Sequence, residues 1–224
     1  MLVIMTRALL VIDVQESFRQ GPLWPTISNP GIADDVARLV DGARANGDLV
    51  VWVLHCEPGS GTVFDPARGH VRYLDPLKPR AGEPQLTKTS HNAFTTTNLQ
   101  QLLTQRGITE VIVCGIRTEQ CCETTVRVAS DLGYRVTFVT EATATNPIAH
   151  RDAPQGQTAG QLLADPRTLP VGAIIERTEY ALAGRFATIA TIAEVTAPAT
   201  GPGTGSGTGV RPARQLSQSG KPAS

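Results

Sequence analysis

Net charge, cysteine and long apolar runs are all scarce in this sequence of 224 residues. Its 20 Lys and Arg residues balance 20 Asp and Glu residues, so no basic excess is present to neutralise nucleic-acid phosphates or anionic lipids. No apolar run approaches the length that a membrane-spanning helix needs. These absences predict a protein that binds neither nucleic acid nor a membrane.

The four cysteines include one adjacent pair but no CxxC pair. They are too few for a disulfide scaffold, so we expect reduced thiols, and a cysteine with a special role is expected to be reactive. The amino terminus has no positively charged segment followed by an apolar run and a small-residue cleavage site. We therefore expect a cytoplasmic protein.

The end of the chain differs in composition from the rest. Residues 196–224 are mostly Gly, Pro, Ser, Thr and Ala, with three basic residues and no acidic one. The run GPGTGSGTG lacks the Lys-Ser/Thr ending of a phosphate-binding loop, and such a composition cannot bury a core. The sequence predicts one domain over 1–195 and a disordered tail over 196–224.

Apolar runs typical of buried strands alternate with helical patterns along the domain. Strands are predicted at 8–14, 49–55, 111–114, 135–140 and 173–176. Helices are predicted after Asn29 up to Gly47 and at 98–106, 120–132, 157–164 and 187–194. Strands separated by helices require right-handed crossovers, so the predicted fold class is α/β, a doubly wound, mostly parallel sheet with helices on both faces.

Ligands in such sheets bind beyond the carboxyl ends of the strands. The residues to consider are therefore Asp13, His55 and the stretches after Thr87 and Cys114. The polar segment 56–84 is too long for a simple connection, and we expect it to line the mouth of the site and to select the substrate.

Three of these residues form a candidate catalytic set. Cys121 lies near the start of a predicted helix, where free N–H groups favour a thiolate and can hold an oxyanion, whereas Cys122 is expected to face another way. Asp13 ends an apolar strand and needs a partner, for which Lys88 is the candidate. Taken singly, these residues also fit a buried small side chain and a structural ion pair.

The segments ALLVIDVQESF, LTKTSHNAF and VIVCGIRTEQCCETTVRVASDLGYRVTFVTEAT resemble the isochorismatase-like cysteine hydrolases, over about residues 7–195. The resemblance implies that Asp13, Lys88 and Cys121 are catalytic. Asp13 would deprotonate Cys121, the thiolate would attack a carbonyl to form a thioester, and Lys88 would orient Asp13. The backbone N–H groups of Arg117 and Cys121 would form the oxyanion hole, next to a cis bond between Ile116 and Arg117.

The resemblance leaves several reactions open. A cysteine favours hydrolysis of a C–N bond in a small amide or cyclic amide, and opening of the lactam of the antibiotic streptothricin, an antibiotic-resistance reaction, is one candidate. Ureido, carbamoyl or nicotinamide hydrolysis and ether cleavage of the isochorismatase type are the alternatives, and a non-catalytic binding or scaffold protein is a further one.

Other expectations concern ligands and partners. Nicotinamidases of the family bind zinc through an Asp-x-His pair and a further His, but this chain has only the separate residues His55, Asp65 and His70, so we expect no metal and no other cofactor. Glu57 and Glu119 are candidates for binding a cationic substrate, or they cap helices and solvate the rim. The expected partners are a small-molecule substrate and, by resemblance, further copies in a homo-oligomer.

Overall fold

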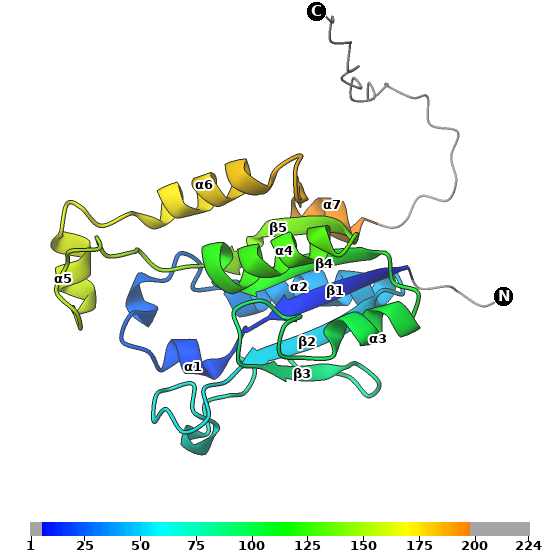
Figure 1. Ribbon diagram of the computed structural model, residues 1–224, viewed down its shortest axis with the longest axis horizontal. Helices are drawn as coiled ribbons and strands as arrows, with labels where there is room; N and C mark the ends of the chain where they lie inside the picture. The colour runs from blue at the N-terminus through cyan, green and yellow to red at the C-terminus, as the bar shows by residue number, and fades with distance from the viewer. Residues whose placement is uncertain (1–5, 198–224) are drawn as a thin grey trace, which may run out of the picture.

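A sheet of six strands forms the centre of the molecule (Figure 1). The structure is a computed structural model that describes residues 6–197. Its strands are β1 (Arg7–Ile12), β2 (Leu49–His55), β3 (Gln85–Lys88), β4 (Glu110–Ile116), β5 (Arg135–Ala144) and β6 (Thr188–Ala190). They lie in the order β3-β2-β1-β4-β5-β6, and every neighbouring pair is parallel.

Within residues 6–197, seven α-helices connect or follow these strands. They are α1 (Glu16–Arg19), α2 (Ile32–Ala45), α3 (Leu99–Gln105), α4 (Glu123–Asp131), α5 (Ala159–Ala164), α6 (Val171–Leu182) and α7 (Ile192–Thr196). In Figure 1, α3 and α4 cover the near face of the sheet, and α2 lies behind it. None of the helices in the described part of the chain is long and apolar enough to span a membrane.

Two apolar clusters stabilise this arrangement, one on each face of the sheet. Alternate residues of β1 divide between them, because successive side chains of a strand point to opposite faces. Leu10 and Ile12 pack with the buried side chains of α3 and α4, whereas Leu9 and Val11 pack with those of α2 and α7. The predicted α/β fold, a doubly wound parallel sheet with helices on both faces, is therefore confirmed.

The strand predicted at 173–176 is wrong, because this segment lies inside α6. Its apolar residues are too few to distinguish the repeat of a helix from that of a strand. Over the full helix, Ile174, Thr178 and Leu182 repeat every four residues and form the buried stripe. Arg177 on the same helix pairs with Glu123 of α4 at 2.6 Å, so tertiary contacts fix the helix in place.

The helix predicted at 187–194 is also wrong, since this segment contains β6 followed by α7. β6 pairs with β5, where Thr137 lies opposite Thr188. α7 begins with a capping box in which the Thr191 hydroxyl and the Glu194 carboxylate bond each other's backbone N–H groups. That Thr-x-x-Glu spacing is visible in the sequence and marks the helix start after the strand. The predicted tail lies almost wholly outside the described residues, so its disorder stays a prediction.

Candidate active site

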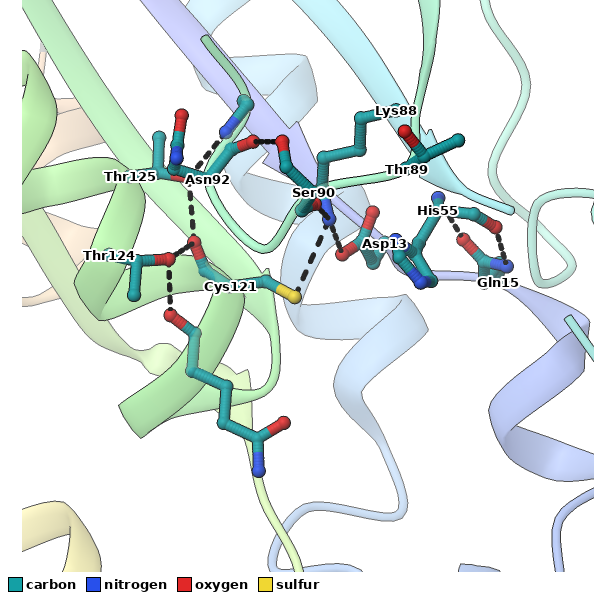
Figure 2. A network of polar contacts seen from close by, with 12 residues as sticks. Asp13, Gln15, His55, Lys88, Thr89, Ser90, Asn92, Cys121, Thr124 and Thr125 are labelled. Atoms are coloured by element: carbon teal, nitrogen blue, oxygen red, sulfur yellow. Dashed lines mark hydrogen bonds and ion pairs between the residues drawn. The ribbon is translucent and has the colours of Figure 1, made fainter. Parts of the chain in front are cut away.

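Asp13, Lys88 and Cys121, which we call the buried triad, meet at the carboxyl edge of the sheet (Figure 2). Lys88 Nζ lies 2.7 Å from Asp13 Oδ2 and 3.4 Å from Cys121 Sγ. The relative exposure is 0% for Asp13 and Lys88 and 6% for Cys121. Because burying a lone charge is costly, the lysine and the aspartate stabilise each other's charged form.

Asp13 directly follows β1 and has an unusual backbone. Its φ of 54° is the one positive value among the described residues other than glycine, a conformation that costs about 1–3 kcal/mol. Hydrogen bonds hold it there, since the Asp13 N–H donates to the Val53 carbonyl and its own carbonyl accepts from the Gln15 N–H. This backbone turn lets β1 end with a buried carboxylate at the site.

A glycine on the neighbouring strand β4 permits the close approach of β1. Gly115 has a φ of 130°, and a Cβ atom built on it would lie 1.8 Å from the Ile12 carbonyl oxygen. No other residue type fits so close to another backbone. Gly115 is not among the residues predicted for the site, although an isolated glycine inside an apolar strand pattern is the signal for such a contact.

Lys88 is the last residue of β3, and the loop that follows it completes its surroundings. Its Nζ also donates to the Ser90 carbonyl at 3.1 Å. The loop is tied to the nucleophile's segment through Thr125, whose hydroxyl accepts from the Ala93 N–H and donates to the Cys121 carbonyl at 2.6 Å. These bonds, most of which Figure 2 shows, hold the lysine and the cysteine in one rigid unit.

Cys121 lies in a π-helical turn, Thr118–Cys122, which leads into α4. Burial and the neighbouring Asp13 raise the pKa of the Cys121 thiol to about 12, and Lys88 offsets this only in part. Burial likewise raises the pKa of Asp13, with Lys88 opposing the change. We expected the helix start to favour a thiolate, but burial has the larger effect on the pKa of Cys121. Cys121 is therefore a thiol that needs a base beside it.

Cys122 differs from its neighbour in its surroundings. It is fully buried and packs in the apolar cluster under α3 and α4. Burial raises its pKa well above the ordinary value. Among the described residues its thiol makes no hydrogen bond to Lys88, unlike the thiol of Cys121.

Arg117 follows β4, and the peptide bond between Ile116 and Arg117 is cis, as the family resemblance implies. The Nε atom of Arg117 is buried without a hydrogen-bond partner, and its guanidinium lies 5.8 Å from the Phe18 ring centroid. Both carboxylate oxygens of Glu119 are also buried without a partner in the described structure. Glu119 therefore does not solvate the rim, whereas its contact with substrate stays a prediction.

Glu57 has a different environment from Glu119. Its side chain is 43% exposed, accepts a hydrogen bond from the Thr62 hydroxyl at 2.9 Å, and lies 3.4 Å from His55 Nε2. It neither caps a helix nor reaches the buried triad in the contacts of the described residues. Glu57 is thus a residue of the outer part of the site.

A cavity of about 510 Å³ adjoins the turn that carries Cys121, although none of the three residues of the buried triad lines it. Arg117 and Gln120 form its inner wall, and its outer wall comes from Pro22, Leu23 and the segment 147–157 after β5. The segment 56–84 contributes no residue to this cavity, so its expected place at the mouth of the site stays a prediction. The segment instead packs inward through residues such as Leu74 and Leu77, which are buried in the core.

The three residues considered for zinc do not come together. Asp65 accepts hydrogen bonds from the N–H groups of Gly61 and Ala67, so its carboxylate orders its own loop. Among residues 6–197, no group of three or more His, Cys, Asp or Glu side chains has the arrangement of a metal site. His55, Asp65 and His70 thus do not fit the ligand set of a zinc centre.

The chain matches known proteins over most of its length. Residues 7–168 match the isochorismatase domain family. The isochorismatase family protein YddQ of Bacillus subtilis is 33% identical over 151 residues, which are 66% of this chain and 83% of that protein. Streptothricin hydrolase of Streptomyces noursei is 38% identical over 146 residues, which are 63% of this chain but only 56% of that protein.

A solved structure agrees with these matches. The crystal structure of an isochorismatase from Pseudomonas putida is 32% identical in sequence and has a TM-score of 0.72. The match covers 84% of this chain and 89% of that chain. Together with the fold and the domain match, this similarity shows that the chain belongs to the isochorismatase family and is a hydrolase.

Proposed function

We propose that this protein is a cysteine-dependent amidohydrolase that cleaves a C–N bond of a small molecule through a thioester. The observation that carries the proposal is the position of Lys88 Nζ between Asp13 Oδ2 and Cys121 Sγ, with all three side chains buried. An activated thiol attacks an amide carbonyl far better than an unactivated hydroxyl does.

In the proposed acylation, Asp13 accepts the proton of the Cys121 thiol as the sulfur attacks the carbonyl carbon. The raised pKa values of both groups fit this transfer, because the proton passes between two groups whose charged forms burial disfavours. The backbone N–H groups of Arg117 and Cys121 hold the oxyanion, and Lys88 keeps the carboxylate oriented. Asp13 then protonates the departing nitrogen as the C–N bond breaks.

In the second half of the reaction, water attacks the thioester carbonyl, the C–S bond breaks, and the acid leaves. Asp13 accepts a proton from the water and returns it to the sulfur, so the enzyme regains its thiol. Charge stabilisation at the oxyanion accounts for about 10² to 10³ in rate for each hydrogen-bond donor.

For the substrate we propose a cyclic amide of the streptothricin type, which the similarity to streptothricin hydrolase supports. Such a reaction would inactivate an antibiotic inside the cell, which agrees with the predicted cytoplasmic location. The proposed enzyme needs no cofactor, and we propose that it forms a homo-oligomer. Isochorismatase-type ether cleavage is the competing reaction.

A substrate screen tests the proposal. The purified chain is incubated with streptothricin, simple primary amides, ureido acids and isochorismate, and each product is followed by mass spectrometry. We expect opening of the lactam or release of ammonia or amine by the wild type, and none by Cys121→Ala. Ether cleavage that persists in Cys121→Ala would favour the competing reaction and contradict the thioester mechanism.

A further inference from the structure

His55 lies beside the buried triad, yet the acylation steps give it no task. It is the last residue of β2, so its side chain lies at the same edge of the sheet as Asp13, and Figure 2 shows the imidazole next to the Asp13 side chain. Its side chain is only 14% exposed. The Nδ1 atom is buried and has no hydrogen-bond partner in the described structure.

The fold holds His55 firmly from the backbone side. The fully buried Gln15 accepts a hydrogen bond from the His55 N–H at 2.8 Å and donates to the His55 carbonyl at 2.9 Å. The Phe64 ring packs edge-on against the imidazole, with 5.6 Å between the ring centroids. The Gln15 nitrogen also donates to the Ser17 hydroxyl at 2.9 Å, so this buried amide ties the end of β2 to the segment that follows Asp13.

The contacts of the ring assign its tautomer. Nε2 lies 3.4 Å from Glu57 Oε1, and an ionised carboxylate can only accept, so Nε2 carries the hydrogen. Burial and the charge of Lys88 lower the pKa of His55, and Asp13 opposes them only in part. The lowered pKa keeps the ring neutral at neutral pH. The lone pair of the neutral ring is then on Nδ1, which becomes a hydrogen-bond acceptor.

The neighbouring Asp13 carboxylate offers a second acceptor without a partner. Asp13 Oδ1 is buried and has no hydrogen-bond partner, whereas Oδ2 contacts Lys88. Among residues 6–197, no ring nitrogen of His55 lies within 4.0 Å of an Asp13 carboxylate oxygen. Two acceptors separated by more than direct contact distance suit a small molecule with two O–H or N–H donors between them.

We infer that His55 Nδ1 and Asp13 Oδ1 together hold the water that hydrolyses the acyl-enzyme, an inference that rests on the thioester mechanism proposed above. One O–H of this water donates to His55 Nδ1, and the other donates to Asp13. As the water oxygen bonds to the acyl carbon, Asp13 takes its proton, the C–S bond breaks, and the proton passes to Cys121 Sγ. His55 fixes the water's orientation and takes no proton itself.

The inference predicts an effect on deacylation alone. With p-nitrophenyl acetate as the probe, acylation of Cys121 releases p-nitrophenol in a burst, and hydrolysis of the acetyl thioester sets the steady state. His55→Leu is expected to keep the burst and kcat/KM within about threefold, while kcat and KM fall together by about 10²-fold, the cost of a misplaced reactant. Acetylated Cys121 should accumulate in rapidly quenched samples analysed by mass spectrometry.

Two further variants separate positioning from a purely structural role. His55→Asn places an amide oxygen close to the position of Nδ1 and should recover part of the lost kcat, which a packing role would not predict. His70→Ala is the matched control, because in the described contacts His70 forms hydrogen bonds only through its backbone carbonyl, which accepts from the Ser17 hydroxyl and the Arg72 N–H. It should behave as the wild type, and circular dichroism should show that all variants are folded.

The outcomes distinguish this inference from the proposed function. A parallel loss of kcat and kcat/KM in His55→Leu without acetyl-enzyme, or no recovery by His55→Asn, would overturn the role of His55 while leaving the thioester mechanism intact. If neither the wild type nor His55→Leu acquires an acetyl group on Cys121, the nucleophile assignment is wrong and this inference fails with it.

Discussion

The buried triad and the cavity lined by Arg117 and Gln120 are built from different parts of the fold. Asp13 and Lys88 stand at strand ends, and Cys121 follows β4 in a tight turn, so the sheet itself sets their distances. The outer wall of the cavity comes from loops, at Pro22, Leu23 and 147–157. The difference teaches that the sheet sets the distances within the triad, whereas loops, which vary more readily, shape the cavity.

The largest expected effect comes from the sulfur. Cys121→Ala should lose all detectable turnover, because among the described residues Cys121 Sγ is the one nucleophilic side-chain atom that hydrogen-bonds Lys88 Nζ. Cys122→Ala, the matched control in the apolar cluster, should keep turnover within a few-fold and lose only some stability. Amine release and thermal unfolding measure the two effects. Equal loss of activity in both folded variants would refute the assignment.

The next effect comes from the carboxylate. Asp13→Asn should lower turnover by about 10² to 10⁴, the usual contribution of general acid–base catalysis. It should also lower the pKa of Cys121 from about 12, because the charge of Asp13 is one of the causes that raise it. The pH dependence of iodoacetamide labelling of Cys121, followed by peptide mass spectrometry, measures this shift. A midpoint that stays in place or moves upward would show that Asp13 does not act on the thiol.

A smaller effect is expected at the cavity wall. Arg117→Ala keeps its backbone N–H but removes a side chain that lines the cavity, so KM should change by about tenfold, and kcat by less than threefold. Arg68→Ala, in the segment 56–84, is the matched control, since its guanidinium bonds the Gly61 carbonyl outside this cavity. Steady-state kinetics on the substrate found in the screen compare the two. A larger KM change in Arg68→Ala would indicate that segment 56–84, and not this cavity, selects the substrate.

The smallest expected effect is a pH dependence of stability at His55. Its folded-state pKa lies below the ordinary value of 6.5, so below that pH the unfolded chain binds more protons than the folded one. Its contribution to the free energy of unfolding is therefore present at neutral pH and declines as the pH falls through 6.5. Urea unfolding from pH 7.5 to 5 should show a weaker pH dependence for His55→Asn than for the wild type, and identical slopes would contradict the shift.

Where the sequence pattern was long and regular, it predicted the fold well. The apolar run of β1 and the helical spacing of α2 gave the parallel sheet, and the strand ends then placed Asp13 and Lys88 at one edge. The pattern failed in α6 and β6, where three apolar residues in a row or a short strand fit either period and where contacts with Glu123 and β5 decide the outcome. In such short segments, tertiary packing and not the sequence period decides between helix and strand.

The candidate site was predicted in its residues but not in its electrostatics or its walls. The order and spacing of three motifs identified Cys121, whereas the raised pKa of its thiol depends on burial that no sequence pattern shows. The clamp that Gln15 forms on His55 joins residues forty positions apart and has no local signal. The cavity likewise depends on the folded position of segment 147–157, which follows β5.

Capture of the covalent intermediate tests the central claim most directly. The wild type is mixed with the substrate found in the screen, quenched in acid within one turnover, digested and analysed by mass spectrometry, with Cys122→Ala treated in parallel. The thioester mechanism predicts the acyl portion of the substrate on the peptide that contains Cys121, in both proteins. Turnover without any adduct on Cys121, or an adduct on Cys122 that vanishes in Cys122→Ala, would contradict it.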